Sequence, residues 1–395
     1  MSDAIFVINA GSSSIKFKLY RLEADDELAP VLAGKLDGIG TRPRLTARDV
    51  NGEILVDRTF DRAEIASAQA AQTRIGEWLA GATDAAIVAV GHRVVHGGPA
   101  YCEPVLIDDA VLETLGSFIP LAPLHQLGNL DPIREIRKRR PGMPQVACFD
   151  TAFHRRHPEF ADRFALPRNL YDEGVKRYGF HGLSYEYVSE ALHDLAPDLA
   201  DGRIVVAHLG SGASLCAISG GKSIETTMSF TALDGVPMGT RSGALDPGVV
   251  LHLIEEKGMS AAEVGHMLYH ESGLAGLSGI SSDVRELLAS PAPEAAFAID
   301  FFCRRVAQSI ASLAVALRGI DAIVFTAGIG ENQPVIRARI VESLAWAGLR
   351  IDEAANERNA LRISAADSSA AVLVVPTDEE GMIARHTLRL IRAKA

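Results

Sequence analysis

Two turns of glycine and serine carry the groups best suited to binding a phosphate. The first follows the β-branched run Ile5–Ala10, and the second follows Ile204–Leu209. When the turns are aligned, Gly11-Ser12 falls on Gly210-Ser211. A glycine turn lets backbone N–H groups and short hydroxyls approach an anion without a Cβ in the way. The pattern predicts a duplicated domain whose two copies hold a polyphosphate between them.

The first turn also brings side chains that suit a nucleotide and its metal. Asn9 ends a predicted strand, where its amide can orient a metal-bound water. Ser12 and Ser14 offer hydroxyls, and Lys16 lies two positions beyond Ser14 on the same strand face. The alternative is a polar hairpin turn with a solvent-facing lysine, and a Gly-Ser turn alone does not decide between them.

A third glycine turn lies near the C-terminus, in the segment Ile323–Asn332. It follows a clear strand and precedes a helix expected to begin at Pro334, a favourable early helical residue. A strand, a glycine turn and a helix N-terminus in succession typically receive the phosphate or sugar of a nucleotide. Three such turns at strand ends favour nucleotide binding over ordinary hairpins.

The segment Gly91–Gly98 places an arginine between two histidines. Arg93 suits a carboxylate or phosphate clamp, because a guanidinium matches such anions bidentately. The spacing of His92 and His96 would align them on a helix, but the flanking valines and glycines predict strand and turn. No HExxH glutamate is present, so a zinc site is disfavoured.

Four further polar residues each have a catalytic and a structural interpretation. Arg241 stands in a loop of small residues that can approach a ligand, or it is a surface arginine. Asp150 ends an apolar strand, a position that favours catalysis or metal binding, or it caps a turn. His181 precedes a helix and could stabilise a transferring phosphoryl group, whereas His125 is ambiguous. For both histidines the alternative is a buried ring bonded to backbone.

Strand-like and helix-like segments alternate along the chain, which predicts an α/β fold. We expect a domain boundary near residue 150, an irregular β-meander over 21–60, and a core or subunit-interface helix over 295–317. The helix over 379–392 is expected to pack back on the first domain. Strands are expected over 4–10, 15–20, 86–91, 145–149, 203–209, 214–218, 321–326 and 371–375, and helices over 63–80, 126–139, 184–194, 248–256, 295–317, 334–346 and 379–392.

The bulk composition disfavours several classes of protein. The 395 residues carry a formal net charge of -11, so nucleic acid and anionic membrane are disfavoured partners and a phosphate must be met by local cations. Four cysteines without ligand-like spacing (Cys102, Cys148, Cys216 and Cys303) indicate reduced thiols in a cytoplasmic protein. No apolar run of about eighteen residues and no export signal are visible.

Taken in order, these motifs resemble those of the acetate kinases over nearly the whole chain. One such string is weak, but ten in family order are specific. The matching strings are Val7–Lys16, Gly91–Gly98, Ala122–His125, Phe149–His154, Arg177–Gly182, His208–Gly210, Met238–Gly243, Gly276–Asp283, Gly328–Asn332 and Pro376–Glu380.

The resemblance implies the fold shared by sugar kinases, actin and heat-shock ATPases, with two ribonuclease-H-like domains around a nucleotide cleft. The first domain would comprise residues 1–150 with a helix over about 380–395, and the second residues 151–379. The resemblance also implies a homodimer that transfers a phosphoryl group reversibly between ATP and acetate. The products are acetyl phosphate and ADP, and the metal would be Mg²⁺, with Mn²⁺ as a substitute.

Site roles in the family carry over to matching positions. Asn9 and Glu379 would serve the metal, Arg93 the acetate carboxylate, and Asp150 would be the acidic catalytic residue. Because acetate is ionised at neutral pH, Asp150 is better assigned to orienting metal-bound water or a His or Arg side chain than to abstracting a proton. The remaining expected site residues are His181 and Arg241 for the transition state; Lys16, Ser12, Ser14, His208, Leu209, Gly210, Ser211, Gly212, Asp283, Val284, Arg285, Gly328, Ile329, Gly330, Glu331 and Asn332 for the nucleotide; and Val95, Leu124, Phe180 and Ala232 for the acyl pocket.

Four positions depart from the family pattern. Ser211 replaces an asparagine and shortens a side chain expected near phosphate, and Gln126 replaces another asparagine. Asp378 also replaces asparagine and adds negative charge beside the metal-site glutamate. Ala232 stands where proline is usual, and the loss of the ring volume enlarges the acyl pocket, which could admit propionate. A methylene discriminates substrates by only about 1–3 kcal/mol, which leaves propionate open.

Three functions therefore compete. An acetate kinase is favoured because Val95 retains bulk in the acyl pocket. A kinase for propionate or butyrate, or one that uses pyrophosphate, is the second, although the intact Gly328–Asn332 favours a nucleoside donor. The third is a non-catalytic actin-like or chaperone-like ATPase, which the fold alone would allow. That class should lack the anion clamp that Arg93 and Arg241 supply.

Overall fold

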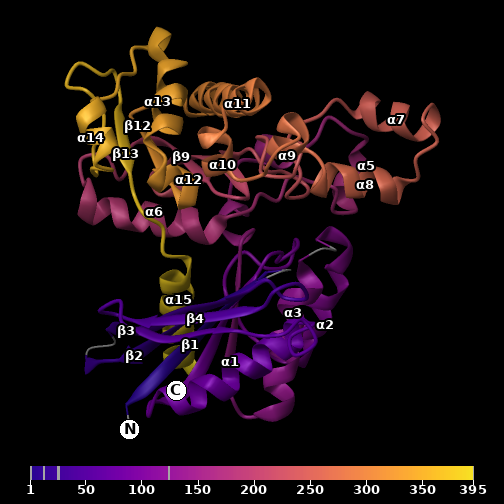
Figure 1. Ribbon diagram of the computed structural model, residues 1–395, viewed down its shortest axis with the longest axis vertical. Helices are drawn as coiled ribbons and strands as arrows, with labels where there is room; N and C mark the ends of the chain where they lie inside the picture. Colours follow the sequence, from indigo (N-terminus) through magenta and orange to yellow (C-terminus); the bar gives the residue numbers. More distant parts are fainter. Residues whose placement is uncertain (1, 12–13, 25–26, 123–124, 395) are drawn as a thin grey trace. The chain divides into compact units, whose positions relative to one another are not determined.

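Two mixed β-sheets organise the chain (Figure 1). The structure is a computed structural model that describes residues 2–11, 14–24, 27–122 and 125–394. The chain divides into unit 1, Met1–Phe153 with Asp378–Ala395, and unit 2, His154–Thr377. One sheet belongs to each unit and helices flank both sheets, so the predicted α/β fold is confirmed.

The sheet of unit 1 has the order β5-β4-β3-β2-β1-β6-β8-β7. β1 is antiparallel to β2 and parallel to β6, which is parallel to β8. Among the described residues of 21–60, β3, β4 and β5 form an antiparallel meander, with a register shift at Ala47/Arg48. The predicted meander is therefore present, and it is more regular than expected. The strands are β1 Asp3–Ala10, β2 Ser14–Leu22, β3 Leu28–Asp37, β4 Arg44–Asp49, β5 Ile54–Thr59, β6 Ala86–Val94, β7 Val105–Leu106 and β8 Gln145–Phe149.

The sheet of unit 2 has the order β11-β10-β9-β12-β13. Its first three strands are antiparallel neighbours, and β12 and β13 extend it in parallel. The order repeats β3-β2-β1-β6-β8 of unit 1, so the duplication predicted from the two Gly-Ser hairpins is confirmed. The strands are β9 Arg203–Leu209, β10 Ala213–Ser219, β11 Lys222–Thr226, β12 Ala322–Thr326 and β13 Ala371–Val374.

Helices cover both faces of the sheet in unit 1. Val90 packs in the core with residues of α1, whereas a Cβ on the neighbouring Gly91 would meet Thr387 and Ile383 of α15 at 2.4 and 2.6 Å. Successive strand residues face opposite sides, so α1 and α15 lie on opposite faces, and only glycine lets α15 pack this closely. The helices of unit 1 are α1 Ala68–Ala82, α2 Asp109–Ser117, α3 Gln126–Arg139 and α15 Glu379–Lys394, with 3-10 turns η2 Ile119–Leu121 and η3 Ala152–His154 at the unit boundary.

In unit 2 the long helix α11 packs on β9, β10 and β11 and buries one side in the core. α13 ends at Glu342, four residues before the predicted end, and a short helix α12 already follows β12. No helix of the described residues is long and apolar enough to cross a membrane. The helices are α4 Glu159–Asp162, α5 Arg168–Asp172, α6 Gly182–Leu195, α7 Pro247–Glu255, α8 Ala261–His270, α9 Gly273–Ser278, α10 Val284–Ala289, α11 Pro293–Leu317, α12 Ala327–Asn332, α13 Pro334–Glu342, η4 Ala345–Ala347 and α14 Glu353–Glu357.

Candidate functional site

In unit 1 the residues predicted to serve metal and acetate meet where three parallel strands end. Asn9, Arg93 and Asp150 lie at the carboxyl ends of β1, β6 and β8, which are neighbours in the sheet. The first turn of α15 lies beside them. Asn9 Nδ2 donates to Glu380 Oε1 at 3.0 Å and is 3.5 Å from Glu379 Oε2. The carboxyl ends of parallel strands are the usual place for a ligand in an α/β sheet.

Asp150 holds Arg93 in a bidentate ion pair. Arg93 Nε donates to Asp150 Oδ1 at 2.8 Å and Nη2 to Oδ2 at 2.5 Å, while Nη1 donates to Asn9 Oδ1 at 3.2 Å. Burial opposes the charge on Arg93, but the attraction of Asp150 outweighs it and raises the Arg93 pKa above its usual value. Two of the three guanidinium nitrogens therefore face Asp150. This geometry suits the orienting role predicted for that carboxylate.

Glu379 is a half-buried carboxyl group in an acidic corner, close to two other carboxylates, Asp150 and Glu380. Burial, together with repulsion from Asp150 and Glu380, raises its pKa to about 7, and attraction by Arg93 and Lys16 acts in the opposite direction. A carboxyl group with a raised pKa is stabilised as the anion by an added cation. The corner is therefore prepared to accept a positive ion.

The donor set in this corner fits Mg²⁺ bound together with a nucleotide. Asn9, Asp150 and Glu379 offer the hard oxygen atoms that Mg²⁺ prefers. Among the described residues, no group of three or more His, Cys, Asp or Glu side chains is arranged to hold a metal ion. Mg²⁺ is commonly bound by one or two carboxylates plus substrate phosphates, and Asn9 and Glu379 offer an amide and a carboxylate oxygen for such a site.

A second lysine, Lys18, forms an ion pair with Asp378, the aspartate that replaces the asparagine usual in the family. Its role was not predicted from the sequence. Lys18 Nζ lies 2.5 Å from Asp378 Oδ1 and 3.7 Å from Glu380 Oε2. Lys16 is exposed on the same strand. The first Gly-Ser turn closes with Gly11 N donating to the Ser14 carbonyl at 2.8 Å, and Ser12 lies outside the described residues. Alternation along the strand was the available signal for Lys18, because it points to the same side as Lys16.

In unit 2 the second Gly-Ser turn lies beside the third glycine turn. β9 and β12 are parallel neighbours with His208 opposite Thr326. A Cβ on Gly210 would lie 3.8 Å from the Cβ of Ala327, the first residue of α12. The predicted nucleotide residues of His208–Gly212 and Gly328–Asn332 are thus brought together, as expected from the sequence.

His181 and Arg241 both face the second Gly-Ser turn. A Cβ on Gly212 would lie 3.4 Å from His181 Nε2 and 3.8 Å from Arg241 Nη2. His181 precedes α6 with a left-handed φ of 58°, and its ring stacks on His208 at 4.2 Å. Arg241 Nη1 donates to the Ala232 carbonyl at 2.9 Å. Two nitrogen groups therefore converge on a turn that exposes backbone amides, which suits an anion.

Asp283–Arg285, the last predicted nucleotide segment, begins α10. The Asp283 carboxylate caps this helix and pairs with Arg285 Nη2 at 2.5 Å. A Cβ on Gly239 would lie 3.3 Å from Ser282, and Gly239 N donates to the Ser211 carbonyl at 3.3 Å. Gly239 thus connects this segment to the second Gly-Ser turn.

Arg337 is a supporting residue that sequence reasoning missed. It is completely buried in unit 2 and donates to the Gly330 carbonyl at 2.8 Å and to the Glu331 carbonyl at 3.0 Å. Asn356 accepts from the same guanidinium at 2.8 Å. Burial lowers the Arg337 pKa to about 10. An arginine early in a helix gives no sequence signal of burial.

The four residues predicted for an acyl pocket stay a prediction. Val95 is buried in unit 1, whereas Phe180 is buried and Ala232 half-buried in unit 2. Leu124 lies outside the described residues. His92, where the sequence disfavours a zinc site, is buried, and its Nε2 lies 2.8 Å from Gln145 Oε1. Burial lowers the His92 pKa to about 4, whereas the bond to Gln145 acts in the opposite direction.

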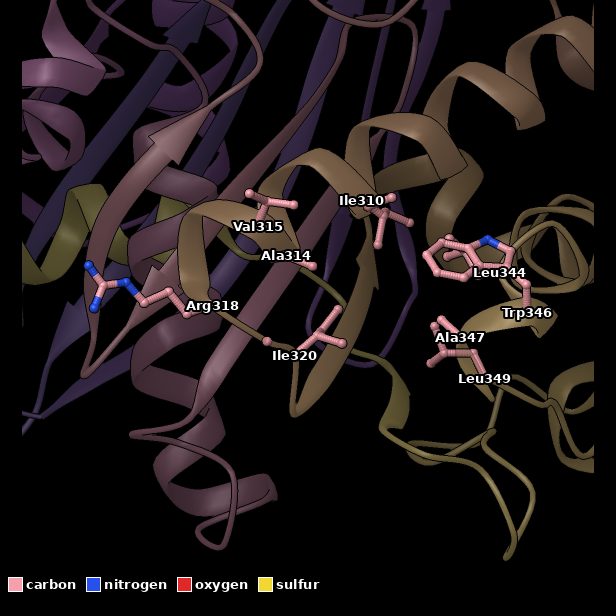
Figure 2. A pocket seen from close by; sticks show the side chains of 11 residues that line it. Ile310, Ala314, Val315, Arg318, Ile320, Leu344, Trp346, Ala347 and Leu349 are labelled. Atoms are coloured by element: carbon pink, nitrogen blue, oxygen red, sulfur yellow. The ribbon is translucent and has the colours of Figure 1, made fainter.

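An apolar groove of about 400 Å³ in unit 2 includes none of the predicted site residues (Figure 2). Ala314 and Val315 of α11 line one side, and Leu344 and Leu349 contribute from the segment after α13. The Trp346 side chain is 78% exposed at its edge. A groove with so few polar groups does not suit a polyphosphate.

The comparisons with known proteins point to a single family. A sequence model of the Acetokinase family matches residues 4–385. The acetate kinase of Nitrobacter hamburgensis is 56% identical over 389 residues, which cover 98% of this chain and 96% of that protein. The acetate kinase of Rhizobium meliloti is 56% identical, with 99% of both chains covered.

Two solved structures are similar over nearly the full length. A propionate kinase from Francisella tularensis matches with a TM-score of 0.90 and 36% identity, covering 99% of this chain and 100% of that one. Acetate kinase from Porphyromonas gingivalis matches with a TM-score of 0.87 and 37% identity, with the same coverage. The resemblance inferred from the ordered strings is confirmed.

Proposed function

This chain belongs to the acetokinase family, and we propose that it transfers a phosphoryl group reversibly between ATP and acetate, giving acetyl phosphate and ADP. The observation that carries the proposed mechanism is the convergence of His181 Nε2 and Arg241 Nη2 on Gly212. A phosphoryl group in transfer spreads negative charge over its equatorial oxygens, so catalysis consists mainly of positioning and charge stabilisation. Hydrogen-bond donors at a glycine turn supply both.

In unit 1 we assign acetate to Arg93. Asp150 already holds Nε and Nη2 of that guanidinium, so the substrate carboxylate would take Nη1, which now donates to Asn9. Asp150 fixes the guanidinium plane, and no general base is needed because acetate is ionised at neutral pH. Asn9 and Glu379 would hold Mg²⁺. The ion, when bound, neutralises charge on the nucleotide phosphates.

In unit 2 we assign the nucleotide to the paired glycine turns. The amides of Ser211 and Gly212 would contact phosphate, since the Gly210 amide already donates to the Gly212 carbonyl at 3.1 Å. The first turn of α12 would contact the rest of the nucleotide. Asp283–Arg285, which Gly239 connects to the same turn, would contact it as well. The family resemblance also implies a homodimer, which light scattering in solution tests.

Propionate is the second candidate substrate. The Francisella tularensis protein named a propionate kinase has a TM-score of 0.90, and Ala232 stands where proline is usual in the family. The ratio of kcat/KM for acetate to that for propionate decides between them. If residue 232 contacts the acyl group, Ala232→Pro should raise the ratio of kcat/KM for acetate to that for propionate. The expected change corresponds to about 1–3 kcal/mol of transition-state binding energy.

The direct test uses purified protein with ATP, Mg²⁺ and a series of short carboxylic acids. Hydroxylamine traps any acyl phosphate as a coloured hydroxamate, and acetate should give the highest kcat/KM. ATP hydrolysis that is independent of the acid would overturn the proposal. Arg93→Ala and Arg241→Ala should each lower turnover far more than ADP affinity, whereas equal losses in both would indicate a non-catalytic ATPase.

A further inference from the structure

A buried chain of hydroxyl groups reaches the ring of His181 within unit 2. His181 Nδ1 lies 2.8 Å from Ser214 Oγ, which lies 2.5 Å from Tyr185 Oη. Ser214 and Tyr185 both have 0% exposure. Tyr185 follows His181 by four residues at the start of α6, so it lies one helical turn further on the same side. Ser214 on β10 follows Gly212 by two residues and supplies the connecting oxygen.

The backbone before His181 is fixed separately. His154 Nε2 lies 3.0 Å from the Phe180 carbonyl, and its Nδ1 lies 2.8 Å from Ser223 Oγ. Burial lowers the pKa of His154 to about 3, so the ring is neutral, and facing a carbonyl requires its proton on Nε2. This contact helps to hold the left-handed φ of 58° at His181, a conformation that costs about 1–2 kcal/mol in a residue with a Cβ.

The direction of the hydrogen bonds follows from the groups in the chain. Burial raises the pKa of Tyr185 well above its usual value, so its hydroxyl keeps the proton. A phenol is a better donor than acceptor, because its oxygen lone pair is delocalised into the ring. Tyr185 therefore donates to Ser214 Oγ, and the single Ser214 hydrogen is left for His181 Nδ1. The histidine proton is then on Nε2, since the partner of one ring nitrogen determines the state of the other.

We propose that Tyr185 and Ser214 are positioning residues that fix His181 in its Nε2-protonated tautomer, with that N–H directed at the turn around Gly212. Stacking on His208 at 4.2 Å restrains the same ring. The chain of hydroxyls thereby directs the His181 Nε2–H group, a hydrogen-bond donor, to the turn where the proposed function places the phosphoryl oxygens. The tautomer itself is a property of the ligand-free protein, so only its catalytic consequence rests on that function.

The first test reads the tautomer without any reaction. The full chain is labelled with ¹⁵N-histidine, and the His181 signals among its 12 histidines are assigned by their loss in His181→Gln. The wild type should show an unprotonated Nδ1 and a protonated Nε2. Ser214→Ala should move both nitrogen signals toward the average of the two tautomers. Unchanged signals would overturn the proposal, whether or not the protein makes acyl phosphate.

The second test is kinetic and uses a matched control. Ser214→Ala and Tyr185→Phe should each lower kcat about tenfold, the effect of losing about one hydrogen bond. The KM values for ATP and acetate should stay within twofold, because the donor acts on the transition state. The control is Tyr178→Phe, another completely buried tyrosine of unit 2, whose hydroxyl donates to the Gly174 carbonyl at 2.9 Å; its kcat should not change.

The double variant tests whether the two residues act in series. If Tyr185 acts only through Ser214, the double variant should lose no more than Ser214→Ala alone, whereas independent effects would multiply. Multiplying effects, an unchanged kcat in both single variants, or a loss equal to that in Tyr178→Phe would each overturn the proposal. Tyr185→Phe keeps the volume of the ring, so it carries the test if Ser214→Ala does not fold.

Discussion

Asp150→Asn is the substitution whose effect the structure specifies best. It keeps the shape of the side chain but removes the charge that faces Arg93 in a pair with contacts of 2.8 and 2.5 Å. The Asp150 side chain is 2% exposed and that of Arg93 18%. Removing one partner of a buried ion pair costs about 3–5 kcal/mol. Because asparagine keeps one acceptor oxygen, we expect a loss at the low end of this range, about 3 kcal/mol of unfolding free energy.

The assay must report on unit 1 alone, because a chain of two units need not unfold in one step. The two tryptophans make this feasible: Trp78 packs against the core of unit 1, and Trp346 belongs to unit 2. In a Trp346→Phe background, fluorescence during urea unfolding follows Trp78 only. Asp57→Asn is the matched control, since it breaks an exposed bidentate pair with Arg44 in the same unit, and solvent screening should make its effect on stability much smaller.

The same variant separates the two roles considered for the carboxylate. If Asp150 orients Arg93, the kcat/KM for acetate should fall at least about tenfold at ordinary magnesium concentrations, equivalent to about 1.4 kcal/mol. A stability loss no larger than that of Asp57→Asn would refute the argument from burial. Full activity with ordinary magnesium would refute the orienting role itself.

Three further predictions concern both units. Gly212→Ala should fold normally, because the backbone φ of Gly212 is ordinary and the added Cβ would come no closer than 3.4 Å to the surrounding atoms. The added methyl group would fill the space in front of His181 Nε2, so turnover should fall about a hundredfold. The urea unfolding curve should stay unchanged. The Glu379 pKa of about 7 in the folded protein lies above the value of 4.5 for a free glutamate. The protonated Glu379 side chain therefore stabilises the folded state below about pH 4.5, and this contribution is lost as the pH rises through 7. Without magnesium, Glu379→Gln should gain stability relative to the wild type between pH 5 and pH 8. Lys18→Met should lower the unfolding free energy of unit 1 by about 1 kcal/mol, because the ion pair with Asp378 is only partly buried. Asp378→Asn in the same chain should restore part of this loss, because it removes the carboxylate that Lys18 contacts most closely. An additive result would contradict this coupling.

The elements that were predicted well are those whose pattern is local. The β-branched runs before Gly11 and Gly210 specify buried strands, and glycine specifies the turns, so both hairpins and the duplication followed from sequence. Helix ends were less certain. α1 begins at Ala68, five residues after the predicted start, because Ser67 Oγ caps the helix by accepting from Ala70 N. An alanine-rich stretch hides such a cap, since its helical propensity is nearly uniform.

The site could be predicted as a set of residues but not as a set of contacts. Nothing in the sequence pairs Arg93 with Asp150, because the pairing depends on β6 and β8 being neighbours in the sheet. The burial of Arg337 had no signal either. Tyr185 was different: its spacing of four from His181 at a helix start was visible, but the partner Ser214 comes from another strand.

In both units, buried groups hold the residues proposed for the site. Asp150 fixes Arg93, Ser214 orients His181, and Arg337 holds the carbonyls of the third glycine turn. A reaction whose nucleophile is already ionised needs little acid–base chemistry, so the protein contributes mainly fixed charges and donors. Fixed donors need no reorganisation during the reaction, and this is where electrostatic catalysis has its advantage. It follows that substitutions of the buried holding residues should lower kcat more than they weaken substrate binding, although none of these residues needs to touch a substrate.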